Sequence, residues 1–401
     1  MGAESTISSS ADPSGGATRA SHIPTGIQLP PYPYDRLEPL KQIAATSHGS
    51  VIDLSVGTPC DPPSESVLQA LVESVDSARS YPPSVGTNQF RSAASDWFRT
   101  RLGLEVPPEQ IAACVGSKEF VAGLPHWLRL RDPSKDTVLY PAVSYPSYEM
   151  GAVLASCRAV PVPLDRHWRL DLSAVDPADA ERALCLWSNT PGNPAGALDD
   201  LAKVAAWGRS HKVPVFSDEC YVEFTWEGPP ATPGQLPGQS ILSSGLDGVV
   251  AVHSLSKRSN LAGVRVGFYA GDAELVRYLS EVRKHGGLMV PGPAQRAAVA
   301  ALNDSVSVLQ QRDSYWSRLG RVAAVLRSVG LEAPLPAGAF YLWVPAPEGD
   351  AWALAERLAK ELGLLVSPGE FYGPAAAGFV RVAVVQNEAN LDELERRAGS
   401  L

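Results

Sequence analysis

The sequence contains a lysine in a setting that favours covalent chemistry with an aldehyde. Lys257 follows the apolar run VVAVHSL (249–255), and Ser254, Ser256 and Arg265 lie close to it in the chain. A lysine at the end of a buried strand loses part of its hydration, which lowers its pKa and makes the amine nucleophilic. Two serine hydroxyls and a guanidinium could hold a phosphate dianion beside it. Taken alone, the pattern is equally compatible with a surface turn that contains Ser and Lys.

A carboxylate and a phenol follow another predicted strand. In VFSDECY, Asp218 ends the strand and Tyr221 comes three residues later. A carboxylate in this place would keep the ring nitrogen of a pyridine cofactor protonated, which makes the ring an electron sink, and Tyr221 could donate to the phenolic oxygen of that ring. The alternatives are a helix cap for Asp218 and a half-buried packing position for Tyr221.

Three further sites have weaker local patterns. Asn193 belongs to the turn NTPGNPAG, which would place its amide beside the same ring, although such turns are common. Gly116-Ser117-Lys118 follows the apolar run IAACV and opens a helix, where free backbone N–H groups suit a phosphate. Tyr145 could cover the face of the ring or pack in the core.

Arg381 interrupts the apolar strand FVRVAVV near the end of the chain. A guanidinium buried in such a strand is unfavourable unless it meets a carboxylate, which indicates either a substrate carboxylate or an outward-facing position. Alternation along the strand leaves both open, because Phe379 and Arg381 share a face.

Short apolar strands alternate with amphipathic helices over most of the chain, which predicts a mostly parallel sheet covered on both faces. Ligand groups of such sheets gather at the C-terminal strand ends. Helices are expected at 64–75, 119–129 and 201–210. The candidate strands cover 51–56, 111–115, 137–141, 183–188, 213–218 and 249–255.

After Pro293 the pattern changes to a long helix, from 294 to about 328, and then to a short sheet pattern (FYLWVPA and GFVRVAVV) with a helix at 351–362 between the two strands. These elements predict a second, α+β domain. The expected organisation is a disordered tail over 1–27, an N-terminal arm and helix over 28–50, a large domain over 51–290 and a small domain over 291–401 that packs with the arm.

Composition narrows the class of protein. The 34 basic and 43 acidic side chains give a net charge of −9, which argues against nucleic-acid and anionic-membrane partners. No apolar run reaches the roughly 20 residues of a membrane span, and the start of the chain lacks the apolar segment of a secretory signal. Five scattered cysteines without a CxxC predict reduced thiols, no zinc site and a cytoplasmic location.

Together with Gly57 and Tyr81, these residues occur in an order and spacing that resembles the class I/II aminotransferases of PLP fold type I, over about residues 28–400. The resemblance implies pyridoxal 5′-phosphate (PLP) as cofactor and amino acids and keto acids as substrates. It also implies an aspartate-aminotransferase-like α/β fold, with a mostly parallel seven-stranded sheet in a large domain beside a smaller α+β domain, and a homodimer with shared active sites.

The resemblance also assigns roles around the cofactor ring. Lys257 would form the Schiff base with the cofactor and carry the proton between the substrate and the cofactor. Asp218 would pair with the pyridinium nitrogen, while Asn193 and Tyr221 contact the ring oxygen and Tyr145 stacks on the ring.

Other residues would hold the phosphate and the substrate. Arg381 would bind the substrate α-carboxylate, with Gly57 and Asn193 nearby, and Arg36 on the arm would contact the distal group. The phosphate would be held by Ser254, Ser256, Arg265, the amides of Ser117 and Lys118, and Tyr81 of the neighbouring subunit.

A narrower likeness concerns the substrate. The stretches DLSVGTP, SYPSYEMGA, SDECYVEF and HSLSKRSNLAGVRVGF are similar to actinobacterial-type N-succinyldiaminopimelate aminotransferases, which implies transfer from glutamate to N-succinyl-2-amino-6-ketopimelate or a related acidic or acylated compound. Ala142 departs from the pattern of that subfamily, and Gly192, Ala195 and Val264 depart from the pattern of the wider family, which leaves the substrate open.

Three alternatives follow. A PLP enzyme of specialised biosynthesis could instead catalyse β- or γ-elimination, γ-substitution or C–C bond formation. A non-catalytic regulator is disfavoured because the chain carries no DNA-binding segment. An NAD-dependent dehydrogenase is disfavoured because Gly57-Thr58-Pro59 follows the first strand in place of GxGxxG.

Overall fold

The computed structural model describes residues 32–228 and 237–401. The tail expected at 1–27 and the first residues of the arm lie outside the described residues. Among those described, none of the helices combines the length and the apolar character that crossing a bilayer requires. All five cysteines are free thiols.

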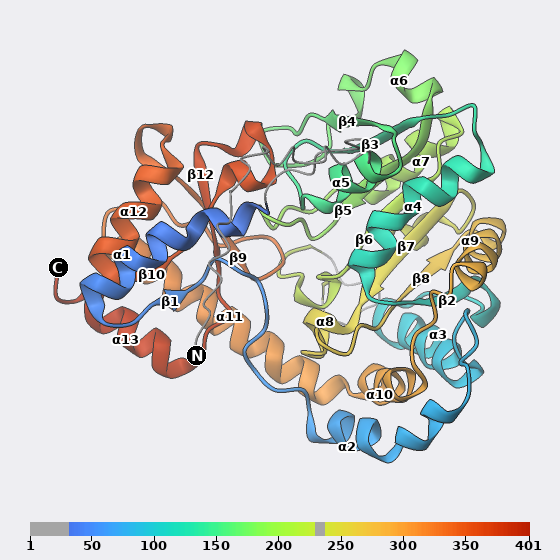
Figure 1. Cartoon of the computed structure of the whole chain (residues 1–401). Helices are drawn as coiled ribbons and strands as arrows, with labels where there is room; N and C mark the ends of the chain where they lie inside the picture. The colour runs from blue at the N-terminus through green and yellow to red at the C-terminus, as the bar shows by residue number, and fades with distance from the viewer. Residues whose placement is uncertain (1–31, 229–236) are drawn as a thin grey trace, which may run out of the picture.

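A seven-stranded sheet with the order β2-β8-β7-β6-β5-β3-β4 forms the centre of the fold (Figure 1). Only β8 runs antiparallel to its neighbours, so the predicted mostly parallel sheet is confirmed. Its strands are β2 (Ile111–Cys114), β3 (Thr137–Pro141), β4 (Arg158–Val162), β5 (Ala183–Asn189), β6 (Val215–Asp218), β7 (Val249–Ser254) and β8 (Gly267–Gly271). The sequence predictions omitted β4 and β8.

Helices cover both faces of this sheet because successive strand residues point to opposite sides. In β6, Val215 packs into a core with α3, α7 and α10, whereas Phe216 packs into a second core with α4, α5 and α9. These helices are α3 (Asn88–Leu102), α4 (Ser117–Arg131), α5 (Ser147–Leu154), α7 (Leu201–His211), α9 (Ala273–His285) and α10 (Gly292–Asn303). Three further helices on this side of the molecule are α2 (Glu65–Glu73), α6 (Pro177–Glu181) and α8 (Leu255–Arg258).

The C-terminal region builds a smaller antiparallel sheet of the order β11-β12-β9, with helices around it. Its strands are β9 (Tyr341–Pro345), β11 (Ser367–Pro368) and β12 (Phe379–Ala383). The surrounding helices are α1 (Glu38–His48), α11 (Ser305–Ser328), α12 (Ala351–Leu362) and α13 (Glu388–Ala398). The expected domain boundaries at 50/51 and 290/291 stay predictions.

Two expectations for individual elements were wrong. The strand expected at 51–56 does not join the central sheet: β1 (Ile52–Asp53) pairs in parallel with β10 (Leu364–Leu365), because Ile52 is buried in the C-terminal core. The single helix expected at 294–328 is two helices, α10 and α11. Asp304 separates them by accepting a hydrogen bond from the Ser307 N–H at 3.0 Å, a helix N-cap that begins α11.

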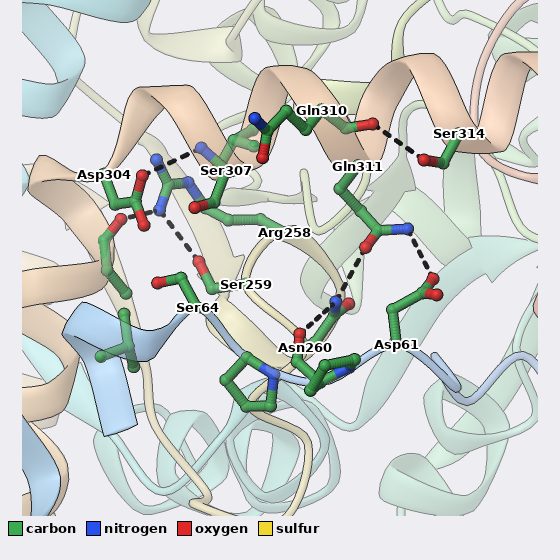
Figure 2. Close-up of a pocket in the computed structure, with 15 residues that line it drawn as sticks. Asp61, Ser64, Arg258, Ser259, Asn260, Asp304, Ser307, Gln310, Gln311 and Ser314 are labelled. Atoms are coloured by element: carbon green, nitrogen blue, oxygen red, sulfur yellow. Dashed lines mark hydrogen bonds between the residues drawn. The ribbon is translucent and has the colours of Figure 1, made fainter. Parts of the chain in front are cut away.

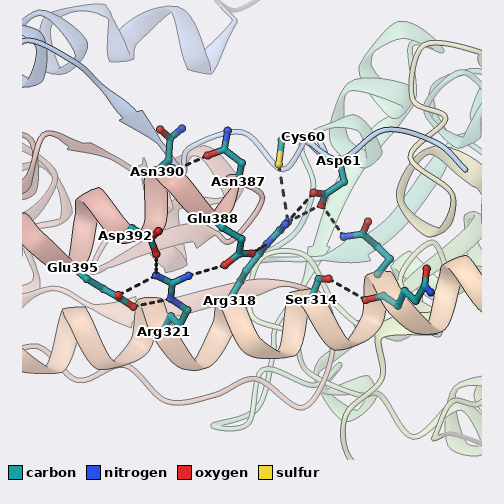
Figure 3. A network of polar contacts seen from close by, with 12 residues as sticks. Cys60, Asp61, Ser314, Arg318, Arg321, Asn387, Glu388, Asn390, Asp392 and Glu395 are labelled. Carbon is teal, nitrogen blue, oxygen red and sulfur yellow. Dashed lines mark hydrogen bonds and ion pairs between the residues drawn. The ribbon is translucent and has the colours of Figure 1, made fainter.

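A network of ion pairs on α11 joins the segment after β1 to the C-terminal helix (Figure 3). Arg318 is buried and contacts Asp61 through two nitrogens, at 2.6 and 2.9 Å, and Glu388 of α13 at 3.1 Å. Arg321 pairs with three exposed carboxylates of α13, including Glu388. The buried, bidentate pair of Arg318 with Asp61 fixes the position of the segment after β1 against α11. Exposed ion pairs like those of Arg321 each contribute little to stability.

Candidate active site

A cavity of about 400 Å³ lies at the C-terminal ends of β5, β6 and β7, where an α/β sheet gathers its ligand groups. Twelve of the fourteen predicted site residues line it: Gly57, Ser117, Lys118, Tyr145, Asn193, Asp218, Tyr221, Ser254, Ser256, Lys257, Arg265 and Arg381. Tyr81 and Arg36 are not among its lining residues.

Lys257 lies on the short helix α8, directly after β7. Its Nζ donates a hydrogen bond to the Gly57 carbonyl, which belongs to the segment that follows β1. Burial lowers the pKa of Lys257 to about 8, and the nearby charges of Arg381 and Arg265 act in the same direction. About a tenth of the amine is therefore unprotonated at pH 7, far more than for an ordinary lysine, and able to attack a carbonyl carbon.

The chain around Lys257 is anchored on the side away from the cavity. Arg258 is buried, donates to Glu223 at 3.0 Å and also contacts the Ala301 carbonyl. A second, polar cavity of about 280 Å³ lies beside this anchor (Figure 2). There, Gln311 of α11 accepts from Asn260 at 2.9 Å and donates to Asp61 at 2.9 Å, so one side chain connects the Lys257 segment with the segment that carries Gly57.

Asp218 ends β6 and is held by two donors. The Tyr148 hydroxyl donates to Oδ2 at 2.9 Å, and the Cys220 N–H donates to Oδ1 at 3.2 Å. Burial raises the pKa of Asp218, and these hydrogen bonds act against the rise. Tyr148 was not among the predicted site residues. In the sequence it is distinguished only as a second tyrosine, three residues after Tyr145.

The residues expected to hold a phosphate surround the start of α4. Gly116 precedes the helix with a φ of +77°, and the free N–H groups of Ser117 and Lys118 begin it. Arg265 lies against Gly116, so that a Cβ at residue 116 would lie 2.2 Å from an Arg265 guanidinium nitrogen. Ser254 accepts from the Ser256 N–H at 3.1 Å, which turns the chain from β7 into α8.

Because Arg265 lies close to Gly116, a substitution at Gly116 tests whether these residues bind the cofactor phosphate. Gly116→Ala would introduce a Cβ at a positive φ and displace Arg265, so we expect a loss of PLP affinity of roughly tenfold. Titration of the apoprotein with PLP, followed by protein fluorescence, measures it. Gly320→Ala on α11 is the control, because a Cβ there meets no atom within 4 Å. An unchanged affinity in Gly116→Ala would contradict the assignment.

Arg381 points into the protein, which excludes the outward-facing alternative. It is 2% exposed, and its guanidinium lies 4.4 Å from the ring centre of Tyr341 and 4.8 Å from that of Tyr372. It donates to Asn193 Oδ1 at 2.8 Å and to the Ser55 carbonyl at 2.6 Å. Such a fixed, planar cation at the wall of a cavity suits a carboxylate.

The two predicted residues outside the cavity have other surroundings. Arg36 pairs with Glu370 at 2.7 Å and stacks 4.8 Å from the ring centre of Trp352. Tyr81 is 94% exposed. Neither side chain contributes to the cavity of this chain, so a role for Tyr81 requires a second subunit.

Lys118 contributes more than its backbone. Its Nζ lies 5.6 Å from the ring centre of Tyr32 and 5.8 Å from that of Tyr145, and all three residues line the cavity. Only the backbone amide of Lys118 was predicted to belong to the site, so its side-chain cation was missed. A position at a helix N-terminus does not predict the direction in which the side chain points.

The lining residues match the three reactive parts of PLP. A buried carboxylate, Asp218, suits the ring nitrogen, the amine of Lys257 suits the aldehyde, and the hydroxyls and guanidinium at the start of α4 suit the phosphate. Residues 49–397 match the family model "Aminotransferase class I and II". The chain belongs to the class I and II aminotransferases. Its expected fold type, enzyme class and dependence on PLP are thereby confirmed.

Named relatives agree with this assignment. The aminotransferase is 37% identical over 369 residues to the 4-dedimethylamino-4-oxo-anhydrotetracycline transaminase OxyQ of Streptomyces rimosus, covering 91% of this chain and 97% of that protein. It is 33% identical over 380 residues to the LL-diaminopimelate aminotransferase of Aquifex aeolicus, covering 92% and 96%. A solved structure, the probable N-succinyldiaminopimelate aminotransferase from Thermus thermophilus, superposes with a TM-score of 0.78 at 31% identity, covering 92% of this chain and 100% of that chain. None of these names describes elimination, substitution or C–C bond formation.

Proposed function

We propose that this aminotransferase transfers the amino group of glutamate to a keto acid with a second acidic or acylated group, such as N-succinyl-2-amino-6-ketopimelate. The observation that carries the proposal is the presence of two separate cations in the cavity beyond those expected at the cofactor, Arg381 and Lys118. One cation suits the α-carboxylate and the other a distal carboxylate or acyl group. The diaminopimelate-type names of two relatives support this substrate class.

Each task in such a transfer has a candidate among the predicted residues that line the cavity. PLP, when bound, supplies a ring that withdraws electrons from the substrate Cα. Asp218, held by Tyr148 and Cys220, keeps a positive charge at the ring nitrogen. Lys257 Nζ would take the proton from the substrate Cα and return it on the cofactor side, a task suited to a base with a pKa of about 8.

The remaining residues bind and orient. Tyr145 would cover the ring, and Asn193 and Tyr221 would face its oxygen. Arg381, clamped by two tyrosine rings, fixes the α-carboxylate so that the Cα hydrogen points at Lys257. The phosphate is held by Ser254, Ser256, Arg265 and the amides of Ser117 and Lys118.

The distal contact is tested by Lys118→Met, which keeps the length of the side chain and removes its charge. We expect kcat/KM for glutamate to fall by about 10- to 100-fold, the usual effect of losing a charged hydrogen bond, and that for alanine by less than about threefold. The change in absorbance of the bound cofactor during a single turnover measures the rate of reaction with each donor. Lys203→Met on α7, whose lysine pairs with Asp200 at the surface, is the control. Equal losses for both donors would contradict a distal role.

A second acceptor class is favoured by a specific likeness. OxyQ, whose name specifies an oxo-anhydrotetracycline, shares 37% identity over almost its whole length. The aromatic rings of Tyr32, Tyr34 and Tyr145 line the cavity and would suit a flat, polycyclic ketone. Comparing an acylated amino-keto acid with a cyclic ketone as acceptor, after loading the enzyme with glutamate, distinguishes the two classes.

We also propose a homodimer in which each site receives Tyr81 from the other subunit. The exposure of Tyr81 supports this arrangement, as do the exposed apolar side chains of Leu68 and Val72 on α2 and of the nearby Val75. Exposed apolar side chains gathered in one place are typical of an interaction surface.

A further inference from the structure

Two buried titratable side chains lie next to the residues expected to bind the cofactor. Glu219 follows Asp218 at the end of β6, and His253 precedes Ser254 in β7. Glu219 is 1% and His253 3% exposed. Neither lines the cavity, because neighbouring side chains of an extended segment point to opposite faces of the sheet.

The two side chains join the neighbouring strands. Nε2 of His253 lies 3.3 Å from Oε2 of Glu219, and neither of these two buried atoms has another hydrogen-bond partner among the described residues. The imidazole also hydrogen-bonds to the backbone of Glu219. The other carboxyl oxygen accepts from the Ile241 N–H at 2.8 Å, and the Glu219 N–H donates to the Val252 carbonyl at 2.9 Å. The pair therefore connects β6 and β7 at the level of the cofactor site.

The surroundings of Glu219 disfavour a charge. Within residues 32–228 and 237–401, no lysine or arginine pairs with it. The groups that face it are the Ser217 and Ser240 hydroxyls, His253 and the acidic Asp218. Burial raises the pKa of Glu219 to about 8.

His253 has equally apolar neighbours. Its ring stacks on Phe268 and meets Trp97 and Phe98 edge-on, and the nearest charges are those of Glu223 and Arg258. Burial lowers the pKa of His253 to about 3. At neutral pH the carboxyl group thus keeps its proton and the imidazole accepts none.

Glu223, four residues after Glu219, provides an internal contrast. It is also buried, but it contacts Arg101 at 2.5 Å and Arg258 at 3.0 Å. Although burial acts to raise the pKa of Glu223, the charges of these two arginines hold it at about 2. Two buried glutamates four residues apart therefore differ in charge at neutral pH, because Glu219 is neutral and Glu223 is ionised.

We propose that the protonated carboxyl group of Glu219 donates to Nε2 of a neutral His253, and that this uncharged hydrogen bond positions Asp218 and Ser254 for the cofactor. Glu219 and His253 are positioning residues, since neither touches the cavity. The inference rests on the PLP site and not on the proposed acceptor, so a failure of either leaves the other intact.

Two replacements of Glu219 test the positioning role in the holoenzyme. Glu219→Gln keeps an uncharged donor for His253 and an acceptor for Ile241, so PLP affinity should stay within about twofold. Glu219→Leu removes both, and PLP affinity should fall by tenfold or more, as for the outer partners of metal ligands. The pH midpoint of the visible absorption of bound PLP should shift in Glu219→Leu and stay at the wild-type value in Glu219→Gln. Wild-type affinity and absorption in Glu219→Leu would overturn the positioning role.

The pH dependence of melting tests the charge state, even if Glu219→Leu fails to fold. A folded pKa raised above the unfolded value gives stability that is complete below the unfolded pKa and is lost as pH rises to the folded pKa. The melting temperature of the wild type should therefore fall relative to Glu219→Gln between about pH 4.5 and 8. For the ionised Glu223, Glu223→Gln should melt below the wild type throughout that range. If the melting temperature of the wild type instead rose relative to that of Glu219→Gln as pH rises, the pair would be a carboxylate and an imidazolium. That result would overturn the proposal.

Discussion

Replacing Lys257 with alanine should lower the rate of amino transfer by about 10⁴-fold or more, the upper range for removal of a catalytic proton-transfer group. In the proposed mechanism the amine at this position takes part in both the covalent attachment of the cofactor and the movement of the Cα proton, so the variant would lose two functions at once. Lys118 also lines the cavity, but its amine lies between tyrosine rings and does not contact the Gly57 carbonyl. It therefore has no means of replacing Lys257.

Two measurements check this prediction. Borohydride reduction followed by peptide mapping should place the cofactor on Lys257 in the wild type and on no lysine in Lys257→Ala. Because the pKa of Lys257 is about 8, the rate at which apoprotein attaches PLP should rise about tenfold per pH unit below pH 8 and level off above it. Activity within tenfold of the wild type, or cofactor recovered on Lys118, would contradict the assignment.

Replacing Arg381 with leucine should lower kcat/KM for amino-acid donors by about 10³-fold, with most of the loss in KM. Removing one member of a buried, hydrogen-bonded charge pair costs about 2–5 kcal/mol, which corresponds to this range. The loss includes the α-carboxylate contact and the hydrogen bonds that Arg381 gives to Asn193 and to the Ser55 carbonyl. PLP affinity should change by less than about threefold, because Arg381 lies in β12 and not among the residues expected at the phosphate.

The structure offers a matched control for this variant. Arg36 was expected to contact the substrate but pairs with Glu370 outside the cavity, so Arg36→Ala should leave kcat/KM within about twofold. Arg381→Lys should recover only part of the loss, because an ammonium lacks the planar two-point geometry of guanidinium. Full activity in Arg381→Leu would contradict a role for Arg381 in substrate binding. A large loss in Arg36→Ala would contradict the position of Arg36 outside the substrate site.

The sequence was sufficient for five of the seven central strands and for most of the site because both depend on local patterns. Buried parallel strands are continuous apolar runs, and polar residues that directly follow them must meet at one edge. Asp218 and Lys257 each directly follow such a run or end it, so their meeting could be predicted without knowing the order of the strands. The family resemblance then supplied distant members such as Gly57 and Arg381.

Features that depend on one distant partner could not be predicted. Arg36 pairs with Glu370, and no local pattern marks that choice. Tyr148 reaches Asp218 at the end of β6 from α5, a helix that packs against α4, β3 and β4. Strand β8 begins and ends with glycine, Gly267 and Gly271, which weakens the apolar signal of a strand.

The pairing of Ile52 with Leu364 has a consequence for biosynthesis. A ribosome synthesises the segment that carries Gly57 before the central strands, whereas its strand partner β10 is synthesised only after them. The central sheet, which ends at Gly271, is complete well before that point. The nascent enzyme thus acquires the strands that lead to Lys257 and Asp218 first, and gains Arg381 and a fixed Gly57 only after the central sheet has been synthesised.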